Sequence, residues 1–132
     1  MRGWLTGGGL DAAGAAHKLA MPQGLFGRGM RLEGRRVTLR LPRMRDAQDV
    51  FTYARDPEVA RYVLWDAHQA LGDSREAIRG MMRRNRGCLP GMFVIELKAE
   101  GRAVGTIGFQ AVDMENRRAE VGYSLARRLW GH

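Results

Sequence analysis

Three runs of alternating apolar and polar residues follow one another closely toward the end of the chain, at 93–98, 103–112 and 118–125. A period of two residues is typical of β-strands that bury one face. The turns between the runs are short and polar, and connections this short join antiparallel neighbours. The pattern therefore predicts a three-strand antiparallel meander. Gly105 and Gly108, inside the second strand, predict a bulge or the close approach of another backbone.

Helical patterns and one further strand precede the meander. A half-buried strand is predicted from 36 to 41, and three helices follow it, each with an aspartate at its start: Asp46, Asp56 and Asp73. The third helix is expected to end near Arg86. Apolar residues at helical spacing predict the buried faces, namely Ala47, Val50, Phe51, Ala54, Val59, Tyr62, Val63, Ala77, Ile78, Met81 and Met82. Strand, helices and meander together predict an α+β, or mixed α/β, fold with helices packed on an antiparallel sheet.

Residues 1–30 differ from the rest of the chain, because they are rich in glycine, carry few charges and show no sustained period. We expect a flexible leader at 1–30 and one domain at 31–132. No run approaches the roughly 18 apolar residues that a membrane helix needs. Cys88 is the single cysteine, so neither an intramolecular disulfide nor a metal site is expected. A reduced, cytoplasmic setting is the resulting prediction.

The chain is strongly basic, with 22 Lys and Arg residues against 14 Asp and Glu residues and a net charge of +8. Only Lys18 and Lys98 are lysines. This balance favours attraction to a polyanion such as RNA, a ribosome or an anionic cofactor. A compositional bias toward Arg, Gly and Ala is the alternative explanation. The arginines are spread along the whole chain rather than gathered in one block, which weakens the case for a nucleic-acid-binding domain.

Four segments, taken in order, resemble the GNAT superfamily of acetyl-CoA-dependent N-acetyltransferases. They are VTLRLPRMRDAQDVF at 37–51, ARDPEVARYVLW at 54–65, GTIGFQAVD at 105–113 and RAEVGYSLARRLWGH at 118–132. Within the superfamily they look like the branch that contains ribosomal-protein N-terminal alanine acetyltransferases. The resemblance covers 36–132, and the fourth segment is the most specific, because its spacing matches a binding motif.

The motif of the fourth segment is Gln or Arg, two residues, Gly, one residue, and then Gly or Ala. Residues 128–132 supply its first five positions. In the family this loop precedes a helix, and its free backbone N–H groups and the helix dipole bind the pyrophosphate of coenzyme A. The resemblance implies acetyl-CoA as the co-substrate, with Gly131 allowing close backbone approach and with Arg127 and Arg128 near the phosphates.

The strand before this loop is the second feature to which the resemblance applies. In the family a bulge splays the strand, so that its main chain pairs with the amides of the pantetheine arm. The resemblance implies that the main chains of Ser124, Leu125 and Ala126 make those contacts. Tyr123 matches a Gly-Tyr pair of the branch, and its place in the alternation predicts packing in the core.

Acetyl transfer to an amine needs a neutral amine and a proton for the leaving thiolate. Several family members carry a general base on this strand, which implies that role for Glu120. The alternative for Glu120 is a solvated strand face, with Arg118 or Arg102 as its partner. Trp65 lies in the loop that forms a substrate wall in this branch, so it either contacts the acceptor or is buried beside Tyr62.

A complete domain of this family continues past the cofactor loop with a helix, further strands and another helix. By comparison we expect a truncated chain with a partial GNAT fold, lacking the C-terminal half of the cofactor cleft. Acetyl transfer is then expected to be impaired, and the chain alone is expected to bind acetyl-CoA weakly or not at all. The last strand would keep an unpaired edge, which lowers solubility.

Three functions remain open from the sequence. The first is acetyl transfer from acetyl-CoA to a primary amine, either a protein N-terminus or a small-molecule amine, with ribosome association as one setting. The second is a non-catalytic remnant or one half of a split domain. The third is a small basic RNA-binding domain, which would show a steep salt dependence and indifference to acetyl-CoA. The acceptor and the oligomeric state are not predicted.

Overall fold

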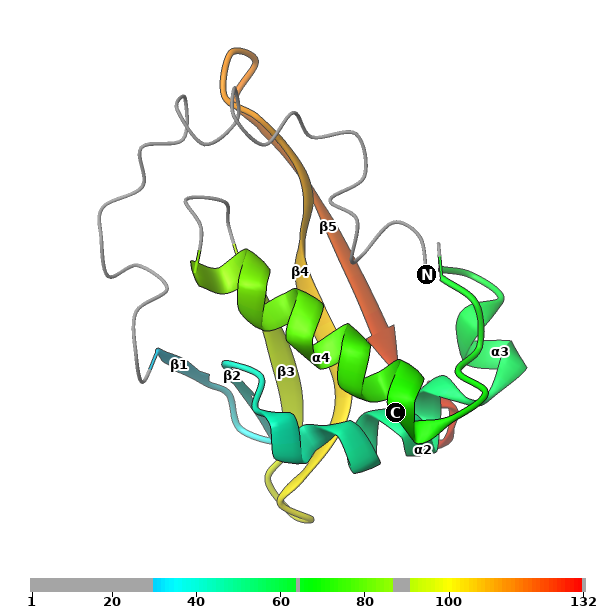
Figure 1. Ribbon diagram of the computed structural model, residues 1–132. Helices are drawn as coiled ribbons and strands as arrows, with labels where there is room; N and C mark the ends of the chain where they lie inside the picture. The colour runs from blue at the N-terminus through cyan, green and yellow to red at the C-terminus, as the bar shows by residue number, and fades with distance from the viewer. Residues whose placement is uncertain (1–29, 64, 87–90, 132) are drawn as a thin grey trace.

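One antiparallel sheet of five strands forms the frame of the protein (Figure 1). The computed structural model describes residues 30–63, 65–86 and 91–131; the predicted leader, apart from Met30, and Cys88 lie outside these ranges. The strands lie in chain order and comprise β1 (Arg31–Glu33), β2 (Val37–Arg40), β3 (Met92–Leu97), β4 (Arg102–Asp113) and β5 (Arg118–Leu125). The predicted meander is confirmed as β3, β4 and β5, and the mixed α/β class is confirmed with it.

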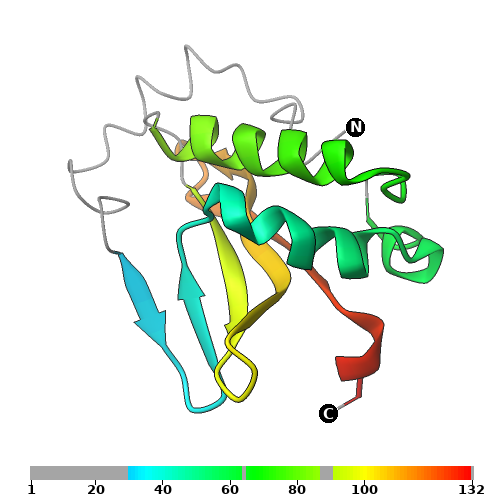
Figure 2. The same cartoon turned by 60° about the horizontal axis from the view of Figure 1, so that its bottom comes forward.

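Helices α2 (Ala47–Ala54) and α4 (Leu71–Arg86) lie side by side on one face of the sheet (Figure 2). The single turn α3 (Pro57–Ala60) follows α2, while the short 3-10 turns η1 (Met44–Asp46) and η2 (Arg127–Leu129) precede α2 and follow β5. The three predicted helices are therefore present. The core between the helices and the sheet is built from apolar side chains such as Val50, Ile78, Met81, Met92 and Val104. None of the helices in the described ranges has the length and apolar character needed to cross a membrane.

Strand β1 has no signal in the sequence pattern, which places the first strand at 36–41. Leu32 pairs with Leu39 of β2, and the Gly34 N–H donates to the Val37 carbonyl (2.8 Å) to close the turn. All three residues of β1 are exposed, and three residues are too few for a period to be recognised. The strand is held by backbone pairing with β2 and by the Glu33 carboxylate, which accepts from the Thr38 hydroxyl (3.1 Å) and pairs with Lys98 (2.8 Å).

The three aspartates that were predicted to cap helices differ in what they bind. Asp56 caps α3 as predicted, accepting a hydrogen bond from the Glu58 N–H (3.0 Å). Asp46 does not cap α2, because its carboxylate binds the buried guanidinium of Arg40 instead. Asp73 lies inside the first turn of α4 and accepts from two backbone N–H groups that precede the helix, so α4 begins two residues earlier than predicted.

Two tyrosines that were expected in the core lie on the surface. Tyr62 is 74% exposed, because α3 ends at Ala60 and the helical spacing that would bury the ring does not continue. Tyr123 is 63% exposed, because it lies on the face of β5 opposite to that of Ser124, whose hydroxyl interacts with Tyr53 of α2. No helix of the described ranges covers that second face of the sheet (Figure 2). Tyr53 of α2, in contrast, is buried although the spacing did not predict it.

Strand β4 carries the irregularities predicted near its glycines. Val104 and Gln110 interrupt the register with β3 and β5, respectively. A Cβ atom on Gly105 would lie 2.3 Å from the carbonyl oxygen of Ser124, which confirms the close approach of another backbone. The bulge that the resemblance placed in 118–125 lies on β4 instead, because every residue of β5 has a partner in register.

Candidate active site

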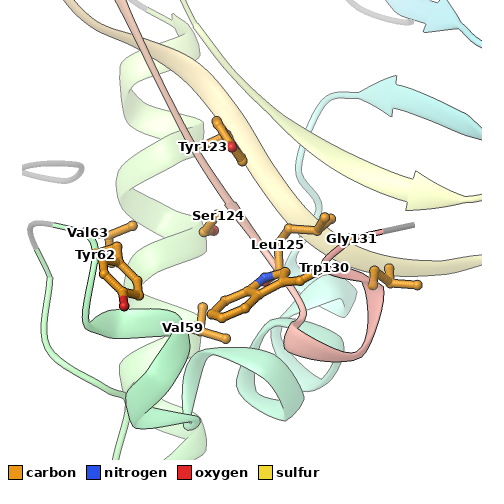
Figure 3. A pocket seen from close by; sticks show the side chains of 9 residues that line it. Val59, Tyr62, Val63, Tyr123, Ser124, Leu125, Trp130 and Gly131 are labelled. Carbon is orange, nitrogen blue, oxygen red and sulfur yellow. The ribbon is translucent and has the colours of Figure 1, made fainter.

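A groove of about 620 Å³ lies beside the C-terminal end of β5 (Figure 3). Its walls come from α3 and the residues just after it, from the end of β5, and from the loop that contains and follows η2. The lining residues are Val59, Tyr62, Val63, Tyr123, Ser124, Leu125, Leu129, Trp130 and Gly131. The fold thus joins two segments that are far apart in the sequence into one concave surface.

The lining of the groove is mostly apolar and aromatic. The rings of Tyr62, Tyr123 and Trp130 are 74%, 63% and 40% exposed, so a ligand can reach all three. No charged side chain is among the lining residues that the structure describes. Polar contacts to a ligand would come from the tyrosine hydroxyls and from the main chain, which is typical of small-molecule sites. Nor do the described residues contain a group of three or more His, Cys, Asp or Glu side chains placed to hold a metal ion.

Ser124 belongs to a cluster of buried hydroxyl groups beneath the groove. Its Oγ lies 3.0 Å from Oγ1 of Thr106 on the neighbouring strand, and both side chains are buried. The Tyr53 hydroxyl interacts with both groups. Burial raises the pKa of Tyr53 above its ordinary value, so the phenol stays protonated. The cluster ties α2 to β4 and β5 and holds the floor of the groove in place.

The main chain at the end of β5 is only partly available to a ligand. Within the described ranges β5 pairs with β4 alone, so its outer edge carries no further strand. The Leu125 carbonyl accepts a hydrogen bond from the Trp130 indole N–H (2.8 Å). Ala126 is buried, and its N–H and carbonyl are both hydrogen bonded within the fold. Of the three residues predicted to contact pantetheine, Ser124 and Leu125 line the groove and Ala126 does not.

The loop after β5 holds the two arginines and the glycine of the predicted cofactor motif. Arg127 pairs with Asp56 at the start of α3 (3.0 Å), and Arg128 pairs with Glu100 in the turn between β3 and β4 (2.9 Å). Both arginine side chains are more than half exposed. Gly131 has a φ of +80°, which favours glycine, and it lines the groove. Of the three, only Gly131 lines the groove, while the two arginines are held by carboxylates outside its lining.

The predicted base and the predicted substrate contact both lie outside the lining of the groove. Glu120 is exposed and precedes Ser124 by four residues on the same face of β5, which corresponds to about 13 Å along a strand. Trp65 is 8% exposed and packs in the core, with its ring centroid 5.2 Å from that of His68. This burial favours the packing alternative for Trp65. The aromatic residue that this segment presents to the groove is Tyr62.

The sequence pattern missed two parts of the site. Tyr62 was assigned to the core, although its position just past the single turn that begins at Asp56 is a signal that it could escape burial. The contact between Tyr53 and Thr106 joins a helix to a strand and has no local signal, because neither residue belongs to a motif. Only the packing of α2 on the sheet brings these two hydroxyl groups together.

The groove at the outer edge of β5 and the loop with a left-handed glycine that follows it lie in a domain of the mixed α/β class. Residues 36–132 match the family described as Acetyltransferase (GNAT) domain. The chain therefore belongs to the GNAT acetyltransferase family, as the resemblance predicted.

One curated relative agrees with this assignment, and two solved structures share the fold. The uncharacterized N-acetyltransferase p20 of Bacillus licheniformis is 34% identical over 96 residues, which cover 73% of this chain and 54% of that protein. RimL, a ribosomal alpha-N-protein acetyltransferase solved with coenzyme A, shares the fold with a TM-score of 0.65 at 16% identity over 78% of this chain and 59% of that one. The microcin C7 self immunity acetyltransferase MccE, solved with acetyl-CoA and AMP, has a TM-score of 0.64 at 22% identity over 74% and 55%. The chain spans about half the length of the curated relatives it matches.

Proposed function

We propose that the groove beside β5 binds acetyl-CoA and that the chain acts in acetyl transfer from this co-substrate to a primary amine. The position of the groove is the observation that carries the proposal. The groove runs past Ser124 and Leu125 and reaches Gly131, which together form the part of the chain that resembles the cofactor-binding segment of the family. In this proposal the chain provides the β5 side of the cofactor cleft.

The pantetheine arm pairs with the main chain at the end of β5 in the way that an added strand would. Ser124 and Leu125 are the two residues at the end of β5 that line the groove and are proposed to make this pairing. The Trp130 indole holds the Leu125 carbonyl, so a cofactor amide has to replace the indole N–H there. One hydrogen bond is exchanged for another, and the net cost of the exchange is small.

The phosphates of the cofactor are assigned to the loop after β5. Arg127 and Arg128 supply positive charge there, and each is held by a carboxylate in an exposed ion pair. Exposed pairs of this kind contribute about 1 kcal/mol or less. A pyrophosphate carries more charge and accepts paired hydrogen bonds from guanidinium groups, so it can displace Asp56 and Glu100. The positive φ of Gly131 turns the backbone so that N–H groups can face an anion.

The transfer requires the amine nitrogen to attack the carbonyl carbon of the thioester. The C–S bond then breaks, the amine loses a proton and the thiolate gains one. Glu120 is the proposed base. Because its side chain does not line the groove, it acts through ordered water rather than by direct contact. Tyr53 cannot serve as a base at neutral pH, since burial raises its pKa and keeps the phenol protonated.

The acceptor is proposed to be a protein N-terminus or a small-molecule amine. Two proteins with the same fold, RimL and MccE, are by their names a ribosomal alpha-N-protein acetyltransferase and a self-immunity acetyltransferase. Tyr62 and Val63 form the wall of the groove opposite β5 and are therefore the proposed acceptor contacts, in place of Trp65. Association with a ribosome is part of the proposal for a protein acceptor.

Calorimetric titration with acetyl-CoA tests the proposal. The chain is compared with a chimera in which the part of p20 that follows its matching region is fused after His132. We expect weak or no binding by the chain and clear binding by the chimera, because the second half completes the cleft. Binding by the chain itself would show that the β5 edge and the Gly131 loop suffice. Failure of both proteins to bind would overturn the proposal.

A single variant tests where pantetheine lies. Trp130→Phe keeps an aromatic ring in the groove but removes the N–H that occupies the Leu125 carbonyl. If a cofactor amide takes that carbonyl, the variant should bind acetyl-CoA several-fold more tightly, since one competing hydrogen bond of about 1 kcal/mol is gone. Tyr123→Phe is the matched control, because it removes a polar atom from another groove ring and leaves Leu125 untouched. Both changes are made in the chimera. An equal change of the affinity for acetyl-CoA in the two variants would argue against a hydrogen bond between a cofactor amide and the Leu125 carbonyl.

A further inference from the structure

Four arginines form a line along the outer face of α4. Arg75, Arg79, Arg83 and Arg86 are all exposed, and they are four, four and three residues apart. At about 100° of rotation per residue, this spacing places them within roughly 80° of one side of the helix. We call these residues the α4 stripe. Charges that are scattered in the sequence are therefore gathered in the folded protein.

Local helix energetics do not account for the α4 stripe. Arg75 and Arg79, like Arg79 and Arg83, are like charges at i and i+4, an arrangement that destabilises a helix. Glu76 pairs with Arg79 (3.6 Å) and with Arg83 (3.1 Å). Arg75 and Arg86 make no ion pair with any residue that the structure describes. The helix dipole favours cations at the C-terminal end of α4 but not Arg75, which lies near its start. This face of α4 therefore carries an excess of positive charge that is exposed to solvent.

The chemistry of the stripe favours phosphate groups. All four cations are arginines, whose planar guanidinium groups donate paired hydrogen bonds to phosphate oxygens. The stripe extends over eleven residue steps, or about 16 Å of helix, which is long enough to contact several phosphates of one backbone. A single small anion would use only one or two of these side chains.

The residues around the α4 stripe favour one kind of polyanion, a nucleic-acid duplex, over a membrane surface or a single strand. The apolar residues of α4, such as Ile78 and Met81, point into the core, so the outer face lacks the apolar side chains with which an interfacial helix enters a membrane. The helix also contains no aromatic residue, so this face has no ring on which an unpaired base could stack. A duplex offers its phosphates without requiring stacking.

We infer that the α4 stripe docks on the phosphate backbone of a nucleic-acid duplex. The surface is separate from the groove beside β5, to which α4 contributes no lining residue. Binding is sequence-independent, because guanidinium groups along a backbone do not read base edges. It is also independent of acetyl-CoA, so its outcome does not depend on the function proposed for the groove.

Fluorescence anisotropy with labelled RNA and DNA duplexes of roughly 20 base pairs tests the inference across a range of salt concentrations. Four phosphate contacts predict that the logarithm of the binding constant falls with the logarithm of salt concentration with a slope of about −3 to −4. A variant with all four stripe residues changed to Gln should lose most of the binding and most of this slope. Comparison of the affinities for the RNA and DNA duplexes shows whether binding depends on the geometry of the duplex backbone.

The matched control removes the same charge from other surfaces. It changes four exposed arginines outside α4 to Gln, namely Arg35, Arg61, Arg102 and Arg118. We expect this variant to keep most of the affinity, and we expect Glu76→Gln to bind more tightly, because Arg79 and Arg83 lose a competing carboxylate. Equal losses in the stripe and control variants would overturn the inference, since net charge alone would then explain binding. Binding to anionic phospholipid vesicles in preference to either duplex would also overturn it.

Discussion

Arg40 is a buried cation, only 4% exposed, that joins three elements. Its two terminal nitrogens donate to the Asp46 carboxylate (2.9 and 2.8 Å), and its Nε donates to Glu96 (2.6 Å). The hydrogen bonds that Arg40 donates to Asp46 raise the pKa of Arg40 above its ordinary value, burial opposes this effect, and the bond donated to Glu96 adds to the increase. This network connects β2, η1 and β3, and it is the reason that Asp46 is not free to cap α2.

Breaking this network should be costly. Arg40→Met leaves Asp46 buried without a cation, and removal of one partner of a buried pair destabilises proteins by about 3–5 kcal/mol. The double variant Arg40→Met with Asp46→Leu should recover much of that loss, because no buried charge at Asp46 is then left alone. Urea denaturation of the two variants and the parent measures both effects. Equal destabilisation of the single and double variants would show that packing, and not charge, is responsible.

His68 makes stability depend on pH. Its Nδ1 lies 2.8 Å from the Ser74 hydroxyl in the interior, and burial lowers the pKa of His68 below its ordinary value of 6.5. The unfolded chain therefore takes up this proton at a higher pH than the folded chain does. Between these two pKa values the unfolded state binds more protons than the folded state. The free energy of unfolding therefore falls as the pH drops below about 6.5, and the contribution of neutral His68 is lost by the time the pH reaches the pKa of the folded protein.

The free energy of unfolding, measured between about pH 7 and pH 5.5, should fall more steeply in the parent than in His68→Asn. Asn places a polar atom near the position of Nδ1, so a bond to Ser74 remains possible while the titrating group is gone. The titration of Asp73 does not contribute to the slope in this pH range. Hydrogen bonds from backbone N–H groups lower its pKa from the ordinary value of 3.8, so it stays ionised above about pH 5.5. An unchanged pH slope in the variant would rule out His68 as the cause.

Strands β4 and β5 approach each other more closely than side chains would allow. At Gly105 an added Cβ would meet the Ser124 carbonyl oxygen at 2.3 Å, which is backbone and cannot swing away. The same stretch holds the Thr106–Ser124 hydroxyl pair and the strand end that borders the groove. At the scale of elements, a glycine therefore sets the position of the groove wall.

Gly105→Ala should destabilise the protein by about 1–3 kcal/mol through overpacking. Gly72→Ala is the matched control: it lies in α4, nothing is within 4 Å of its added Cβ, and replacement of a helical glycine stabilises by up to about 1 kcal/mol. Thermal unfolding should thus shift in opposite directions in the two variants. A Gly105→Ala protein as stable as the parent would mean that β5 can move away from β4.

The whole molecule has a sheet with two unlike faces. The face under α2 and α4 buries side chains such as Val94, which is fully enclosed, whereas Val121 on the other face is 55% exposed. Exposed apolar surface of this extent is typical of interaction sites and of aggregation-prone proteins. The folded state should therefore tolerate a charge at Val121 and not at Val94.

Val121→Lys should fold with a melting temperature close to that of the parent and should bind less of the hydrophobic dye ANS. Val94→Lys should unfold the protein, because it buries an unpaired charge in the core. Circular dichroism and ANS fluorescence on both variants measure the contrast. Unfolding of Val121→Lys would show that the second face is covered more closely than its exposure indicates.

The sequence by itself determined the class of fold, the order of the elements from β2 onward and the family. Alternation of apolar and polar residues identified β3, β4 and β5, and helical spacing with Asp56 as a cap identified the helical segment. These features are local, because a period and a cap depend only on residues within a few positions of each other. The cofactor motif that contains Gly131 is local in the same way, and Ser124, Leu125 and Gly131 line the same groove.

Tertiary structure decided which face of each element is covered and which partner each polar group takes. Alternation shows that two strand faces differ, but it does not say which one meets a helix, so Tyr123 was placed in the core. Arg40 recruits Asp46 and Glu96, and no local rule anticipates a partner 56 positions away along the chain. The hydrogen bonds of the Ala126 main chain and of the Trp130 side chain are likewise set by the tertiary structure and not by a local rule. The physical reason is that burial and hydrogen bonding depend on all the groups that are close in space in the folded protein. The sequence specifies which groups are present, but only the tertiary structure brings them together.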